Sequence, residues 1–470
     1  MWIMFKIIKG IPKTYLKISL VILAVSYLVI SFLFRYEDIV SYTVWSVNFW
    51  DLLFEGRLGD FYAYSEENIR QAPHGIFCGS YLTIFPWILW NFPLYLTHRL
   101  PANVRVDSLF CILWSKVLLL ICIAGIGFYS YKIVRNIVNG TEEQAWLSVI
   151  LSVGGYEIIN STAYAGQDEV IYVVCILAAL YYLLMGRRKS FLICSCMSVT
   201  ICPIMLVPYL AAYLIYEKNI LKILGTTLVV LLPSMVFEIV YRHVDLYQRM
   251  KGTNTISVFE SMLGGQLVGT ALGSVSMVGI AFILLFFICY ISHHDEKSKQ
   301  GFLIYMIAVS FFIICFMAPF NVFYRFGIYT PFWAILLVIF YDRIDMNIFL
   351  LTVICYGRAF LSLGYTLNPN IILTQNWNSK FLMPEILSLL EGEIQMRATA
   401  EMAANILGDL YFMFLFLIRT VVFAAAIILM MTNWKGWSRK VGITISYKIS
   451  LLVYVCSSIL MLGAFVICIL

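Results

Sequence analysis

Residues 15–38 read YLKISLVILAVSYLVISFLFRYED, and this stretch decides the class of fold. Its apolar run is long enough to cross a bilayer as one helix, which takes about 20 residues. Four lysines precede residue 18, and cytoplasmic flanks of spans are enriched in Lys and Arg. Because no small-residue cleavage site follows the run, we interpret residues 15–34 as a retained signal anchor with a cytoplasmic N-terminus.

The composition of the whole chain agrees with a polytopic membrane protein. Of 470 residues, 62% are hydrophobic and 12% are charged, whereas soluble domains average about half apolar and a quarter charged. No polar run is long enough for a soluble domain, so we expect residues 1–470 to form a single all-α membrane domain. Successive loops must lie on opposite sides of the membrane, and placing the loops rich in Lys and Arg in the cytoplasm predicts about 11 full spans. They lie near residues 15–34, 107–130, 145–163, 168–185, 221–240, 272–291, 302–319, 328–341, 345–363, 407–431 and 449–470.

Two apolar segments do not fit this pattern as simple spans. Residues 76–97 would invert every later loop if they crossed once, and Pro86 and Pro93 interrupt them, so we expect a juxtamembrane or re-entrant element at the outer interface. Residues 190–215 have basic flanks on both sides and are interrupted at Pro203 and Pro208. We interpret them as two half-helices that return to the cytoplasmic side and line a cavity.

The predicted topology leaves three long segments outside, at residues 35–106, 241–271 and 364–406. In the first, DIVSYTVWSVNFWDLLFEG (38–56) has apolar residues near helical spacing and predicts an amphipathic helix in the interface that ends at Gly56. This segment is also unusually acidic. Its seven acidic residues are Glu37, Asp38, Asp51, Glu55, Asp60, Glu66 and Glu67.

Three further motifs accompany this acidic segment. GQDE (166–169) opens a predicted span that is followed by GRRK (186–189) and the Pro-interrupted segment 190–215, and YRFGIYTPFWAILL (324–337) leads into another predicted span. Together with an acidic residue directly after the first span, these motifs resemble the GT-C superfamily of polytopic glycosyltransferases. The resemblance covers most of the first 340 residues in architecture, and each motif is short and degenerate.

The resemblance implies transfer of a sugar from a polyprenyl-phosphate carrier to a glycan or glycolipid acceptor on the outer membrane face. It makes Asp38 the general base, with Glu37 as the nearest competitor, and Asp168 a second acidic residue of the site. Gln167 and Glu169 beside it are candidate substrate-binding residues. The alternatives are that Glu37 and Asp38 merely end a span in water, and that Asp168 is a helix cap.

The donor phosphate needs basic partners, and the resemblance points first to Arg325, in a short outer loop. Its neighbour Tyr324 is a further candidate substrate-binding residue. Arg242 and His243 form a second basic group after residue 240, and His74 lies in APHG of the first outer segment. Arg325 could instead meet ordinary lipid headgroups. His74 departs from the family pattern, as does Cys202 before Pro203, so details of donor binding do not transfer.

Other classes stay open: a lipid-linked polysaccharide polymerase or ligase, a polysaccharide-lipid transporter, and a non-catalytic membrane subunit. A transporter should have two similar halves, and segment 190–215 has no counterpart in the second half. No residue spacing demands a metal, although paired carboxylates could bind a divalent cation. We expect a multi-pass protein of a bacterial plasma membrane with membrane lipid, and not nucleic acid, as its further partner.

Two smaller expectations concern charges and caps. Charged residues inside spans are rare and need partners, so Lys116, Arg358, Arg419 and Glu238 are expected to form structural ion pairs. NGTEEQ (139–144) predicts a helix start in which Thr141 and Gln144 cap each other.

Overall fold

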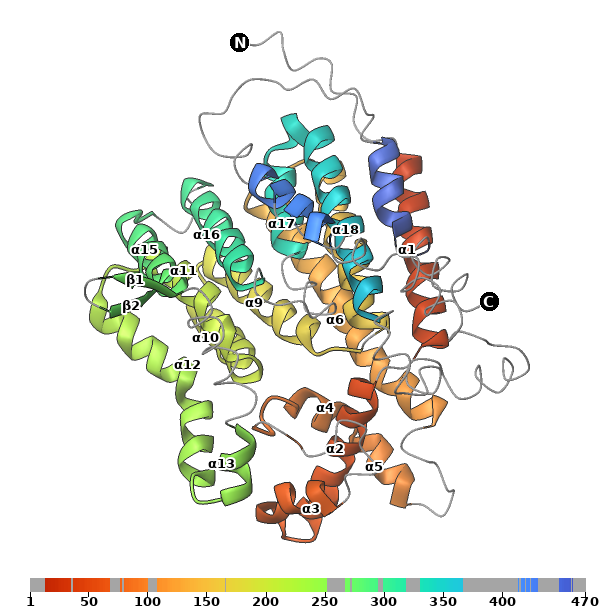
Figure 1. Cartoon of the computed structure of the whole chain (residues 1–470), viewed down its shortest axis with the longest axis vertical. Helices are drawn as coiled ribbons and strands as arrows, with labels where there is room; N and C mark the ends of the chain where they lie inside the picture. Colours follow the sequence, from red (N-terminus) through yellow and green to blue (C-terminus); the bar gives the residue numbers. More distant parts are fainter. Residues whose placement is uncertain are drawn as a thin grey trace.

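The structure is a computed structural model, and it is largely helical (Figure 1). It describes residues 13–34, 37–67, 77, 80–99, 108–164, 166–251, 267–270, 273–294, 299–317, 330–366, 413, 416–418, 420–422, 424–429, 448–457 and 459. The predicted all-α class is confirmed within these ranges, apart from one antiparallel hairpin of β1 (Leu267–Thr270) and β2 (Gly273–Ser276).

The helices up to residue 184, in chain order, are α1 (Lys13–Leu33), α2 (Glu37–Phe54), η2 (Leu58–Asp60), α3 (Phe61–Glu67), α4 (Phe85–Trp90), α5 (Phe92–Arg99), α6 (Leu109–Asn136), α7 (Glu142–Val153), α8 (Tyr156–Ile159), the π-helix η3 (Asn160–Tyr164) and α9 (Glu169–Leu184). Those from residue 188 onward are α10 (Arg188–Ile201), η4 (Pro203–Met205), α11 (Leu206–Tyr216), α12 (Ile220–Tyr241), α13 (Asp245–Lys251), α15 (Met277–Ile291), α16 (Lys299–Met317), α17 (Thr330–Ile339), η7 (Tyr341–Arg343) and α18 (Ile344–Thr366).

Among the described residues, three helices are long and apolar enough to cross a membrane: α1, α6 and α12. Several others, including α9, α15 and α17, are apolar but shorter, at 10–17 residues. The predicted span at 145–163 is not one helix, because α7 ends before Gly154 and Gly155 and the chain continues as α8 and η3. Much of the predicted spans 407–431 and 449–470 lies outside the described residues.

The element predicted from residues 76–97 forms α4 and α5, which are too short to span, and Pro86 lies in the first turn of α4. Both helices pack on α2, as does α6. The polar side chains of α2 therefore face protein: Thr43 is within 2.8 Å of Ser115 on α6, and Ser46 accepts a 2.9 Å hydrogen bond from Asn91. Helices α4 and α5 therefore cover part of α2, and the position of α2 in the membrane interface stays a prediction.

Two predicted helix boundaries of this part of the chain are confirmed. The helix from residue 37 ends before Gly56, whose φ of +70° closes a turn in which Arg57 N–H donates to the carbonyl of Leu52 at 2.8 Å. Thr141 and Gln144 form the predicted capping box at the start of α7.

The segment 190–215 folds as two antiparallel half-helices, α10 and α11, broken at Cys202 and Pro203. The interruption predicted at Pro208 is wrong, because Pro208 lies in the first turn of α11, where a proline is tolerated. Phe191 near the start of α10 stacks on Tyr213 near the end of α11, with ring centroids 5.7 Å apart. Arg188, the first residue of α10, forms a 3.2 Å ion pair with Glu217, directly after α11. The two ends of the segment therefore lie together, as the sequence predicts.

Charges inside the predicted spans have different partners. Arg358 on α18 forms the expected ion pair, with its Nε 3.5 Å from Glu157 Oε1 on α8, and both side chains are buried. Glu238 instead accepts hydrogen bonds from Tyr247 and Gln248. Arg419 lies outside the described residues.

The buried pair predicts a non-additive response to mutation. Removing one charge leaves the other uncompensated, so Arg358→Met should lower the free energy of unfolding by about 3–5 kcal/mol. Arg358→Met combined with Glu157→Leu should restore most of the loss, as measured by chemical unfolding in detergent micelles. A single variant within about 0.5 kcal/mol of the parent, the usual range for surface substitutions, would show that the pair contributes little.

Candidate functional site

The candidate site is built around Lys116, two turns into the long apolar helix α6. Its side chain is 1% exposed and comes from α6. The ammonium donates hydrogen bonds to the backbone carbonyls of Ser31 at 3.0 Å, Ala163 at 2.7 Å and Phe34. A lysine ammonium has three donors, and these carbonyls use all three. The partners of Lys116 are thus backbone carbonyls rather than the carboxylate expected from the sequence.

These three bonds hold two segments that are far apart in the chain. Phe34 directly follows α1 and lies three residues before α2 begins at Glu37, and Ala163 lies three residues before Gly166. Rings of Phe34 and Tyr164 also meet edge to face, with centroids 5.0 Å apart. The start of α2 and the GQDE turn therefore both directly follow segments that are bound to Lys116 on α6.

Gly166 brings the GQDE turn against α2. Its φ is +66°, and a Cβ at this position would lie 2.7 Å from the Cβ of Ile39, the residue after Asp38. Only glycine combines this backbone conformation with so close an approach. The acidic starts of α2 and α9 are therefore neighbours in space, which the sequence resemblance required but could not establish.

The side chains at this junction are largely buried. Asp38 is 7% exposed, Gln167 4% and Glu169 3%, and Asp168 is partly exposed. Ser161 Oγ donates to Glu169 Oε2 at 3.2 Å, and the carbonyl of Ser161 accepts from Gln167 N–H at 2.9 Å, so η3 fixes the turn. Asp168 occupies the N-cap position of α9, but its side chain makes no capping hydrogen bond there.

The other acidic residues of the first outer segment have different surroundings. Glu55 and Asp60 both form ion pairs with Arg57 at the surface, at 3.3 Å and 3.0 Å. Asp51 is partly exposed and Glu66 is exposed. Of the cluster's side chains that the structure describes, only that of Asp38 is buried. Glu37 begins α2, and its side chain is outside the described part, as is that of Glu67.

The structure describes two of the basic candidates, Arg242 and His243. Arg242 and His243 are exposed at the C-terminal end of α12, where Arg242 Nε donates to His243 Nε2 at 2.9 Å. Arg325 and His74, the other predicted phosphate contacts, and Tyr324, a predicted substrate-binding residue, fall outside the residues that the structure describes.

A cluster of aromatic residues joins this end of α12 to the first outer segment. Tyr62 on α3 packs on Tyr247 of α13 with ring centroids 5.2 Å apart, and Tyr241 donates to Tyr81 at 3.4 Å. Burial, together with the hydrogen bond to Glu238, raises the pKa of the Tyr247 phenol, which therefore stays a donor. The end of α12 thus belongs to the layer formed by α2, α3 and α4, as Figure 1 also shows.

Sequence reasoning missed the positioning residues of the site. Lys116 was noticed only as a charge in a span, and that rarity was the available signal. The roles of Ser161, Thr43 and Asn91 depend on contacts between distant segments, and their types occur throughout the chain. Within the described residues, no group of three or more His, Cys, Asp or Glu could hold a metal ion.

Comparison with known proteins adds no relative: no family model matches the chain, and neither a curated protein nor a solved structure matches it. The likeness to GT-C enzymes therefore rests on the residues and motifs of this chain alone.

The close approach of Gly166 to α2 yields a controlled prediction. Gly166→Ala places a Cβ against Ile39 in a left-handed backbone, and it should cost about 1–2 kcal/mol for the conformation and about 1–3 kcal/mol more for overpacking. Gly56→Ala has the same left-handed strain, but nothing lies within 4 Å of its Cβ, so it isolates the first contribution. Equal losses in the two variants, measured by chemical unfolding, would contradict the contact.

Proposed function

We propose that this chain is a membrane glycosyltransferase that moves a sugar from a polyprenyl-phosphate carrier to a glycan or glycolipid acceptor on the outer face of a bacterial plasma membrane. In this proposal the N-terminus is cytoplasmic and the helices cross the membrane about 11 times, some of them as short or broken spans. The acidic starts of α2 and α9 then face the outside.

The observation that carries the proposal is the burial of Asp38 next to the GQDE turn. A carboxylate is an effective general base only when it is held in place within hydrogen-bond reach of its substrate. Asp38 sits at the start of a helix packed against α4, α5 and α6, so its backbone is well fixed. Surface carboxylates such as Glu55 and Asp60 are engaged by Arg57 and lie on the exposed turn after α2.

The proposed reaction uses these groups as follows. An acceptor hydroxyl oxygen attacks the anomeric carbon and forms the new glycosidic bond, while the bond from that carbon to the phosphate oxygen breaks. The hydroxyl proton passes to the Asp38 carboxylate, and the polyprenyl phosphate leaves with the electron pair. Asp168, Gln167 and Glu169 orient the sugar or acceptor, with Glu37 as the alternative base.

The leaving phosphate needs positive charge, for which the sequence offers Arg325 first, then Arg242, His243 and His74, with Tyr324 beside the sugar. Arginine suits a lipid-linked phosphate because its guanidinium can form two parallel hydrogen bonds. A divalent cation bound to the acidic residues could supply further charge.

Replacing the proposed base tests the function. Asp38→Asn keeps the shape of the side chain but removes its basicity, so sugar transfer should fall about 10²–10⁴-fold. The assay follows labelled sugar from synthetic polyprenyl-phosphate donors into membrane glycans, with purified protein. Asp51→Asn, on the same helix but partly exposed, is the matched control and should keep its rate within about twofold. Full activity of Asp38→Asn would defeat the assignment.

A further inference from the structure

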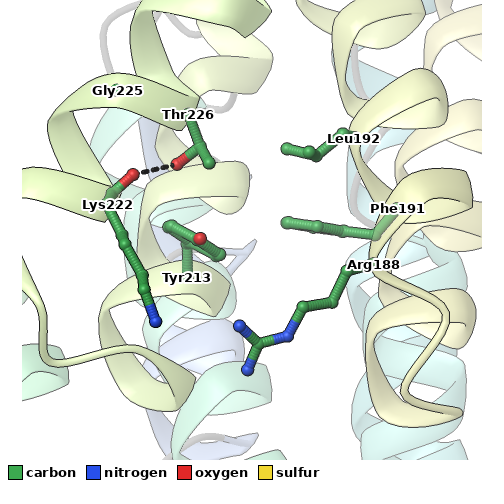
Figure 2. Close-up of a pocket in the computed structure, with 7 residues that line it drawn as sticks. All are labelled: Arg188, Phe191, Leu192, Tyr213, Lys222, Gly225 and Thr226. Carbon is green, nitrogen blue, oxygen red and sulfur yellow. Dashed lines mark hydrogen bonds between the residues drawn. The ribbon is translucent and has the colours of Figure 1, made fainter.

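A pocket lies between α10, α11 and α12 (Figure 2). Its volume is about 340 Å³. Its lining residue Arg188 comes four residues after the C-terminal end of α9, whose N-terminal end belongs to the candidate site. Helix α9 has 16 residues, so its two ends are about 24 Å apart. The pocket is lined by Arg188, Phe191, Leu192, Tyr213, Lys222, Gly225 and Thr226.

One end of the pocket is strongly basic. Figure 2 shows the head groups of Arg188 and Lys222 on the same side of the Phe191 and Tyr213 rings. Glu217 lies 3.2 Å from Arg188 and 3.8 Å from Lys222, so one carboxylate serves two cations. Residues 187–189 and 217–222 together hold five Lys or Arg and one Glu. The Arg188 and Lys222 side chains remain 52% and 60% exposed, which leaves donors for an external anion.

The Glu217 carboxylate already has several hydrogen-bond and ion-pair partners. Burial by itself raises the pKa of the Glu217 carboxyl. The hydrogen bond from Asn219 N–H and the charges of Lys222 and Arg188 together lower it by more, so the pKa lies below its usual range. At neutral pH this carboxylate therefore holds the two basic side chains over the pocket without neutralising both.

The rest of the pocket is apolar and faces an apolar surface. Phe191, Leu192 and Tyr213 form its walls, and Gly225 leaves open space where any other residue would carry a side chain. Helix faces on both sides expose large hydrophobic residues, as expected for contact with acyl chains. They include Leu221, Leu224 and Leu228 on α12 and Ile193 and Met197 on α10.

We propose that this pocket binds one anionic phospholipid of the surrounding bilayer, independently of the sugar-transfer function. Its phosphate lies between Arg188 and Lys222, and an acyl chain runs past Phe191 and Leu192 along Gly225. Basic pockets between membrane helices bind anionic headgroups in this way. The combination of two exposed cations with apolar walls and flanks selects an amphiphile over a soluble phosphate compound.

The test uses the full-length protein in non-ionic detergent, titrated with dioleoyl phosphatidylglycerol and followed by native mass spectrometry. Gly225→Leu fills the pocket and favours the helix, so it should fold well and weaken binding at least tenfold. Arg188→Gln with Lys222→Gln should weaken binding by a similar factor, because charge-assisted hydrogen bonds are lost. Lys189→Gln is the matched control on the same helix start, outside the pocket, and should bind within about twofold of the parent.

Three results would overturn the proposal. They are unchanged phosphatidylglycerol binding in Gly225→Leu, equal binding of dioleoyl phosphatidylcholine, and displacement of the lipid by glycerol phosphate at the same concentration. Because transfer activity is not measured, failure of the proposed sugar transfer would leave this result unaffected.

Discussion

The bonds from Lys116 to three backbone carbonyls are the constraint on which the candidate site depends. Carbonyls at the end of a helix have no partner within the helix, and those of Ser31 and Phe34 lie at the end of α1. A buried ammonium without hydrogen-bond acceptors also raises the free energy of the folded state, and positive charge is favoured at a helix C-terminus. One side chain thus satisfies both needs, and the Ala163 carbonyl adds η3 to the same point. The acidic turns that follow each segment are positioned as a result.

The rest of the described fold separates the buried carboxylates at the start of α2 and α9 from the basic pocket between α10, α11 and α12. Helix α9 runs from the Asp168 turn toward Arg188, and α12 runs from the Glu217 region to Arg242. Buried carboxylates gather where α2 meets the GQDE turn, whereas Arg188 and Lys222 gather where α10, α11 and α12 meet.

Features that depend on local sequence could be predicted, and those that depend on contacts between segments could not. The stop at Gly56, the capping box of Thr141 and Gln144 and the break at Pro203 follow from backbone preferences of a few residues. The return of segment 190–215 to its own side followed from its basic flanks. In contrast, the burial of α2 depends on where α4 and α5 pack. The division of residues 145–163 into α7, α8 and η3 is not visible in their hydropathy, because all three parts are apolar enough to read as one span. Of the site, the acidic residues were predicted from sequence, but Lys116 and Ser161, which position them, were not.

Hydrogen exchange in a Lys116→Met variant tests the central claim most directly, with Lys132→Met on the same helix as the control. If Lys116 anchors both segments, backbone amides in the peptides containing Ile39 and Gly166 should exchange faster together by about tenfold, the effect of 1.4 kcal/mol of lost local stability. The capping box at Thr141 and Gln144 should exchange as in the parent protein. Unchanged exchange in either peptide, or acceleration in only one of them, would contradict the account of a shared anchor.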